Sequence, residues 1–223
     1  MKTVLLRLEG PLQSWGTQGK YGIRDTDREP SKSGVLGLVG AALGMPRDDH
    51  DLLGRLRELE LAVRVDREGT VLRDYHTVGA GTFRGKPHSL WSRDNKKDPA
   101  LTERFYLMDA SFLVGLGGDE ALVDRIAAAL QAPVWPLFLG RRACPPSAPV
   151  FAGVTADPPE AALRAAPIDR ERAPEAVRLI TEAAHEGTPR VDVPISFALY
   201  ERRHALRYVK SELLDRDQLP EAK

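Results

Sequence analysis

The sequence predicts an α+β fold in which helices cover one face of an antiparallel sheet. Short runs of apolar and β-branched residues, bounded by glycine and proline, predict strands. Segments between them have apolar residues at helical spacing. With 223 residues, 42% of them hydrophobic, the chain can bury a core larger than that of a small domain.

The N-terminal elements have clear boundaries. Thr3 to Glu9 predicts a strand that ends at Gly10-Pro11. Residues 13–30 lack periodicity and form a loop long enough to suggest a function. A helix then begins with Ser31 or Ser33 as its cap and ends at Gly44, before a proline that forbids its extension.

The elements that follow indicate the topology. We expect a helix at Asp51–Glu58, a hairpin of Leu59–Asp66 and Thr70–Val78 turning at Glu68-Gly69, a strand at Phe105–Leu116 and a helix at Asp119–Gln131. The segment 79–104, rich in glycine and proline, interrupts this series. The order of strands and helices is typical of a ferredoxin-like fold.

Prolines become dense after Ala132, and two last strands are expected at Arg190–Tyr200 and His204–Leu214. We therefore expect two units: residues 1–135, including an excursion at 79–104, and a smaller β-rich unit at 136–223.

Composition points to a cytoplasmic protein. The only cysteine is Cys144, which excludes an internal disulfide and a multi-cysteine zinc site. The N-terminus has no signal-peptide pattern, and no apolar run approaches the roughly 18 to 20 residues that cross a bilayer. No membrane partner, metal or cofactor is expected. The 32 basic and 32 acidic residues cancel, so the distribution of charge must indicate any polyanionic partner.

Basic charge is concentrated in two segments. Residues 1–47 contain seven basic and four acidic side chains, and residues 84–104 contain six and three. Each segment also contains a tryptophan, Trp15 in the first and Trp91 in the second. Cationic and aromatic side chains together suit unpaired bases better than a duplex. The alternative is a pair of solvated loops whose tryptophans pack on the core.

The helix start at Pro30-Ser31-Lys32-Ser33-Gly34 suits a phosphate, because free backbone N–H groups, hydroxyls and a lysine meet at the positive end of the helix dipole. It lacks the spacing of a nucleotide-binding P-loop. Arg141 and Arg142 lie in a loop bounded by glycine and proline, where they can clamp a phosphate or a base.

His76 could act as a general base on a ribose 2′-OH, and its neighbour Tyr75 points to the opposite face of the same strand. A structural or RNA-contacting histidine is the other interpretation. Asp48-Asp49-His50-Asp51 contains metal-ligand types, but acidic residues at a helix start explain it more simply.

Five segments, taken together and in order, resemble the CRISPR-associated CasD family, the Cas-five type of RAMP protein of type I-E Cascade. From the first to the last they span about two-thirds of the chain, and they are LRLEGPLQSWG (Leu6–Gly16), EPSKSGVLGLVGAALG (Glu29–Gly44), RDYHTV (Arg73–Val78), TERFYLMDASFLVGL (Thr102–Leu116) and PLFLGRRACPPSAPVF (Pro136–Phe151).

The resemblance implies a ferredoxin-like, RRM-related RAMP domain with a protruding thumb at 79–104 and a small C-terminal β-rich unit. It implies a non-catalytic subunit that binds the 5′ repeat handle of crRNA, kinks the RNA where handle meets spacer and caps the backbone filament. The expected partners are the crRNA handle, the Cascade backbone subunit and the large PAM-recognising subunit, with target DNA nearby.

On this interpretation, RNA contacts come from two groups of residues. In the main domain they are Gln13, Trp15, Arg24, Arg28, Ser31, Lys32, Ser33, Tyr75, His76, Arg141 and Arg142, and in the thumb they are Arg84, Lys86, Trp91, Arg93, Lys96, Lys97 and Arg104. The alternative is a metal-independent endoribonuclease that processes repeat RNA, as in type I-C relatives, with His76 and Tyr75 as the catalytic candidates.

Overall fold

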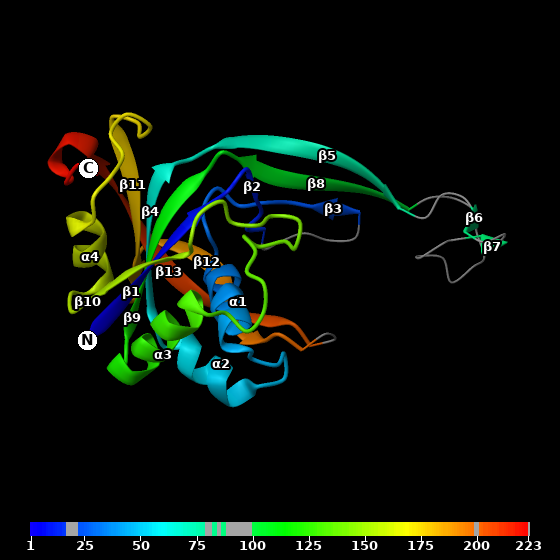
Figure 1. Ribbon diagram of the computed structural model, residues 1–223, viewed down its shortest axis with the longest axis horizontal. Helices are drawn as coiled ribbons and strands as arrows, with labels where there is room; N and C mark the ends of the chain where they lie inside the picture. The colour runs from blue at the N-terminus through cyan, green and yellow to red at the C-terminus, as the bar shows by residue number, and fades with distance from the viewer. Residues whose placement is uncertain (17–21, 79–81, 84–85, 88–99, 199–200, 223) are drawn as a thin grey trace.

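A seven-stranded antiparallel sheet forms the centre of the protein (Figure 1). The computed structural model describes residues 1–223 apart from 17–21, 79–81, 84–85, 88–99, 199–200 and 223. In spatial order the strands are β10 (Phe151–Thr155), β1 (Lys2–Glu9), β9 (Ser111–Gly118), β4 (Glu60–Arg67), β11 (Ala176–Ala183), β13 (Arg203–Asp215) and β12 (Thr188–Ser196).

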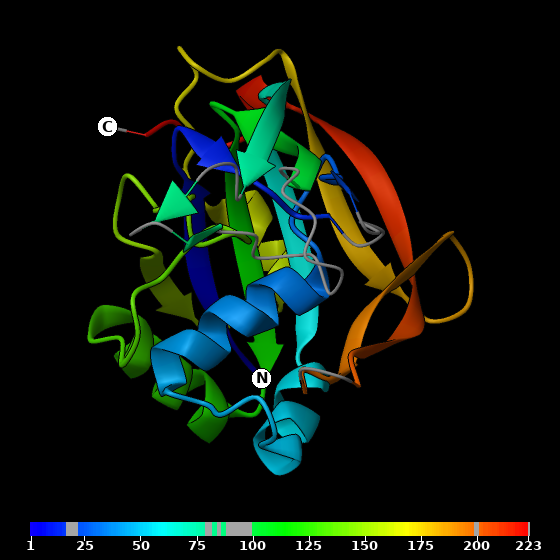
Figure 2. The ribbon, with the colours of Figure 1, turned by 90° about the vertical axis from the view of Figure 1, so that its right-hand side faces the viewer.

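Helices cover both faces of this sheet, unequally. α1 (Lys32–Leu43), α2 (His50–Arg57) and α3 (Glu120–Gln131) lie on one face, and α4 (Pro159–Ala165) lies on the other (Figures 1 and 2). β1 therefore has apolar residues on both faces: Val4 and Leu6 enter the larger core, while Leu5 packs against the smaller one. In the described part of the chain, every helix is too short or too polar to span a lipid bilayer.

The ferredoxin-like prediction is confirmed. β1, α1, β4, β9, α3 and β10 follow one another as a βαββαβ series, with α2 added after α1. The spatial order β10-β1-β9-β4 places the first and third strands at the centre, as in ferredoxin-like sheets.

Capping residues explain where the helices begin and end. Ser31 caps α1 by accepting a hydrogen bond from the N–H of Gly34 at 3.3 Å, and Gly44 ends the helix with φ 67°. Asp119 caps α3 in the same way, through the N–H of Leu122 at 2.9 Å. The three predicted helices are thus present with nearly the predicted bounds.

The predicted hairpin of residues 59–78 is wrong, although both strands exist. β4 pairs with β9 and β11, whereas β5 (Thr70–Val78) pairs with β8 (Ala100–Met108). The predicted strand 105–116 is likewise two strands, because the chain bends at Asp109, whose φ is 59°. Gly69, with φ 72°, provides the matching bend between β4 and β5. Beyond these two bends the chain continues from β4 into β5 and returns through β8 into β9. β5 and β8 therefore form an arm that projects from the sheet (Figure 1).

Two short strands flank β8, one at the base of the arm and one near its middle. β2 (Leu12–Gln13) pairs antiparallel with β8, and β3 (Ile23–Arg24) pairs parallel with it. Farther out, β6 (Thr82–Phe83) pairs with β7 (Lys86–Pro87). The remaining thumb residues between β5 and β8 lie largely outside the described part of the chain.

The C-terminal strands extend the main sheet. β10 pairs with β1 and β11 pairs with β4, so strands from beyond residue 136 flank the N-terminal ones on both sides. β12 and β13 agree with the two last strands expected, while β10, β11 and α4 were not predicted. A unit boundary at 135/136 stays a prediction, but it does not separate two sheets.

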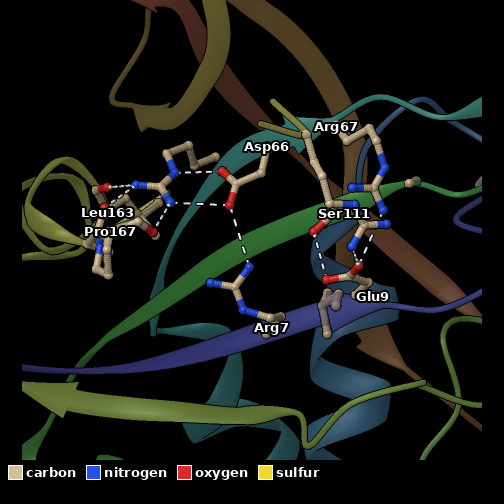
Figure 3. A network of polar contacts seen from close by, with 12 residues as sticks. Arg7, Glu9, Asp66, Arg67, Ser111, Leu163 and Pro167 are labelled. Atoms are coloured by element: carbon tan, nitrogen blue, oxygen red, sulfur yellow. Dashed lines mark hydrogen bonds and ion pairs between the residues drawn. The ribbon is translucent and has the colours of Figure 1, made fainter. Parts of the chain in front are cut away.

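A buried arginine fixes α4 to the sheet. Arg64 on β4 is fully buried, and its guanidinium donates to the carbonyls of Leu163, Ala166 and Pro167 at 2.6, 2.6 and 2.9 Å. The same group pairs with Asp66 through bonds of 2.6 and 3.2 Å. Figure 3 shows Asp66, Leu163 and Pro167 joined through this guanidinium, beside a second cluster of Glu9, Arg67 and Ser111. Arg64 thus satisfies carbonyls at the C-terminal end of α4 that the helix itself leaves without donors.

Candidate nucleic-acid groove

A basic groove opens beside α1, on the face of the sheet that carries three helices. Its volume is about 1320 Å³, and Ser33, Gly34 and Gly37 of α1 form part of its wall. Among the described residues, five guanidinium groups and a single carboxylate, that of Asp25, line it. We call this site the arginine groove and define it by Arg24, Arg47, Arg141, Arg142 and Arg202. Such a surface attracts a polyanion.

Arg141 holds the wall of the groove together. Its guanidinium donates to the carbonyls of Phe105, Arg24 and Asp25 at 3.2, 2.8 and 3.0 Å. It also lies 4.8 Å from the centre of the Tyr106 ring, in cation–π geometry. Arg141 therefore joins β3 and β8 to the loop after α3, and most of its donors already have partners within the protein.

Arg47, Arg142 and Arg202 are the groove residues best placed to contact a ligand. All three are exposed. Within the described residues, their side chains form no hydrogen bond or ion pair. Arg24 is also exposed, on β3, and its side chain is similarly without a described partner. Their donors can reach an incoming phosphate without breaking an internal contact.

The structure gives Trp15 a packing role in place of the expected stacking role. The residue is 1% exposed, and its Nε1–H donates to Oε1 of Gln13 at 3.0 Å. Gln13 is also buried and donates in turn to the carbonyls of Leu8 and Ala110 at 3.1 and 2.8 Å. Because the indole has no open face, neither residue can meet a base in this conformation. The alternative interpretation of this loop fits Trp15 better.

The expected phosphate site at the start of α1 is occupied by carboxylates of the protein itself. Asp192 on β12 accepts a hydrogen bond from the backbone N–H of Lys32 at 2.8 Å. The Lys32 side chain is buried and pairs with Glu182 on β11 at 2.9 Å. Ser31 is the helix cap, whereas Ser33 is half-buried and lines the arginine groove. Of the three residues, Ser33 alone stays open to a ligand.

Asp192 is stabilised as an anion. Burial opposes its ionisation, but two hydrogen bonds from Arg207, at 2.6 and 2.8 Å, together with the charge of Arg207 and the Lys32 N–H, lower the pKa of Asp192. The carboxylate links β12 and β13 to the start of α1. Its charge therefore contributes to the stability of the fold.

We expect Asp192→Asn to lower the free energy of unfolding by about 2 kcal/mol near neutral pH, because Arg207 loses its anion while an amide oxygen still accepts from Lys32. Because the pKa of Asp192 is lower in the folded than in the unfolded state, its ionisation stabilises the fold. This contribution is complete above about pH 4 and is lost as the pH falls through the folded-state pKa of Asp192. Denaturant unfolding of wild type and variant, at neutral pH and in acid, measures this contribution. A difference between wild type and variant that does not shrink in acid contradicts the role of the Asp192 charge.

The arm carries Tyr75 and His76, and neither lines the arginine groove. Tyr75 is 60% exposed. His76 lies beside Asp74, with 3.6 Å between Nδ1 and Oδ2. Arg104 is on β8 and its Nε–H donates weakly to Thr102 at 3.4 Å. Arg28 is exposed but also lies outside the groove lining.

The thumb assignments stay predictions. Arg84, Trp91, Arg93, Lys96 and Lys97 lie outside the described residues. Lys86 belongs to β7, but its side chain is not described.

Two other sequence features have structural explanations. Asp49 caps α2 by accepting from the N–H of Leu52 at 2.9 Å, which accounts for the acidic run at 48–51. Burial raises the pKa of the Cys144 thiol, despite the opposing charge of Arg141, so Cys144 is a poor nucleophile. Among the described residues, no three histidine, cysteine or acidic side chains gather where a metal could bind.

Sequence reasoning missed Arg47, Arg202 and Trp135 as parts of the groove wall. Arg47 follows the Gly44 end of α1, and Arg202 lies in the connection between β12 and β13. Only the tertiary fold brings them together. Trp135 had a local signal: an aromatic residue between Pro133 and Pro136, shortly before the arginine pair.

Comparisons with known proteins identify the family of the chain. Residues 3–210 match the family model described as CRISPR-associated protein (Cas_Cas5). The chain is 40% identical over 162 residues to the CRISPR system Cascade subunit CasD of Escherichia coli (strain K12), covering 66% of this chain and 68% of that protein.

Two solved structures are also similar. One, described as a CRISPR RNA-guided surveillance complex, has a TM-score of 0.79 and 39% identity over 96% of this chain and 90% of the other. The second, described as a crystal structure of a Cas protein, has a TM-score of 0.76 and 36% identity over 99% and 98%. This chain belongs to the CRISPR-associated Cas5 family.

Proposed function

We propose that this protein is a non-catalytic, crRNA-binding subunit of a type I-E Cascade complex, and that it holds the 5′ repeat handle in the arginine groove. The observation that carries the proposal is the gathering of five guanidinium groups and one carboxylate in a single groove. The side chains of four of these arginines, all but Arg141, have no described internal partner, so their charge is available to phosphates.

The partners follow from the likeness to the CasD subunit and to the surveillance complex. In the cytoplasm the protein caps the filament of backbone subunits and adjoins the large PAM-recognising subunit, with target DNA nearby. The β5–β8 arm extends away from the sheet and carries the thumb outward (Figure 1). A projecting thumb can reach the RNA where handle meets spacer and kink it there.

The geometry of the arm favours holding RNA over cutting it. Tyr75 and His76 are consecutive residues of a regular strand, opposite Glu103 and Thr102, so their side chains leave opposite faces of the arm. They cannot both act on one phosphate from the same side. The one charged partner of His76 among the described residues is Asp74.

Incubating the purified protein with repeat RNA in EDTA tests the proposal. We expect the protein to bind the RNA and leave it at full length, because no acid–base pair is assembled. A specific metal-independent cut that His76→Ala abolishes, and that the exposed control His185→Ala retains, establishes the endoribonuclease instead. RNA that is neither bound nor cut leaves only an assembly role and contradicts the proposal.

A further inference from the structure

Trp135 is the one exposed aromatic residue among the described lining of the arginine groove, where Phe138 and Phe197 are half-buried. Trp135 is 46% exposed, in contrast to Trp15 at 1%. It lines the same groove as Arg47, Arg142 and Arg202. Singly exposed apolar residues are common on protein surfaces, but this ring lies inside a groove that is lined by arginines.

The backbone at Val134 and Trp135 is fixed to α1. The Trp135 N–H donates to the carbonyl of Ala41 at 3.2 Å, and the Val134 N–H donates to that of Ala42 at 3.0 Å. Pro133 and Pro136 restrict the chain before and after. The close approach of Val134 to Gly44, where an added Cβ would lie 2.9 Å from Cγ1, fixes the segment further. Little backbone entropy remains to be lost when a ligand binds.

The surroundings indicate what covers the ring. Guanidinium groups around an aromatic face suit a nucleotide, whose base stacks on the ring while its phosphates pair with the cations. They do not suit an acidic protein helix, which offers no flat ring to the indole, nor an apolar protein surface, which would bury unpaired arginines at a large desolvation cost.

We propose that Trp135 is a stacking platform for one unpaired base of the RNA held in the arginine groove. The proposal rests on the proposed function and adds the class of nucleotide bound: single-stranded, with its base turned out of any helix. The ring supplies stacking, Arg142 and its neighbours supply charge, and the two contributions are separable by experiment.

The test measures binding of the 5′ handle RNA to the purified full-length protein as Trp135→Ala, Trp135→Phe and wild type. We expect Trp135→Ala to weaken binding by about 5- to 100-fold, the range for loss of one stacked base, with an unchanged dependence on salt. Trp135→Phe keeps a ring and retains most of the affinity. The control is Leu213→Ala on β13, which truncates a residue that is 68% exposed and should leave RNA affinity unchanged.

A scan of single abasic sites through the handle identifies the base. An abasic site at one position should weaken RNA binding by the wild-type protein. The same abasic site should not weaken binding by Trp135→Ala further, because the indole on which that base stacks is already absent. Equal unfolding midpoints for the three proteins exclude a change in folding.

Three outcomes overturn the inference. RNA affinity that is the same in wild type and Trp135→Ala rejects the platform, even if the protein binds RNA and the proposed function holds. Unchanged RNA affinity with weakened assembly of the purified Cascade subunits assigns Trp135 to a protein interface. Failure of the wild-type protein to bind handle RNA rejects the proposed function, and the platform with it.

Discussion

Replacing Arg64 by alanine is expected to lower the free energy of unfolding by about 4 kcal/mol, the largest effect on stability that we predict for a single substitution. The guanidinium is fully buried and satisfies three carbonyls and one carboxylate. Its loss leaves Asp66 buried, and among the described residues Arg7, 3.7 Å away, is then the one partner of its carboxylate. The α4 end carbonyls lose their donor at the same time.

Urea unfolding of wild type and variant measures this loss, with Arg55→Ala on the exposed side of α2 as a control that should change stability by less than about 0.5 kcal/mol. Because α4 lies on the face of the sheet opposite α1, handle binding by the folded variant should be unchanged. A loss of stability no larger than the control's contradicts the role assigned to Arg64.

The fold was largely predictable because local signals set most of its elements. Ser31 and Gly44 bound α1, Asp119 begins α3, and the apolar periodicity of both helices is regular. Strand pairing was less predictable. The bends at Gly69 and Asp109 separate β5 and β8 from the main sheet as an arm. These two bends lie side by side because β5 pairs with β8, and the sequence of neither strand reveals that pairing. β11 fills the edge of β4 from more than a hundred residues away.

The site was predictable by residue type more than by role. Arg142 is exposed in the groove, whereas Arg141 holds neighbouring carbonyls of the protein and Lys32 is paired with Glu182. Sequence alone cannot distinguish a free cation from a paired one, since the carboxylates that pair with Lys32 and its N–H come from β11 and β12. The position of Trp15 also depends on the tertiary fold, because Gln13, which accepts from its indole, is bound in turn to the carbonyl of Ala110.

The second large effect concerns the arginine groove itself. Replacing Arg47, Arg142 and Arg202 together by alanine should weaken handle binding by about 100-fold at about 0.1 M salt, since each lost phosphate contact removes about 0.7 from the salt exponent for a single strand. Because these side chains have no described internal partner, the unfolding midpoint should stay the same.

A matched variant separates local contact from total charge. The matched variant replaces Arg55, Arg125 and Lys210 by alanine and so removes the same number of positive charges. All three residues are exposed and lie outside the groove. Only long-range attraction is lost there, so we expect a small fall in affinity that disappears above about 0.15 M salt, where the Debye length is about 8 Å.

The most direct measurement is therefore the Kd for handle RNA as a function of salt in wild type and these two triple variants. The account predicts that the slope of log K against log salt falls by about 2 in the groove variant and is nearly unchanged in the matched variant. Equal slopes in wild type and the groove variant, or equal losses in the two triple variants, contradict the claim that the arginine groove holds the RNA.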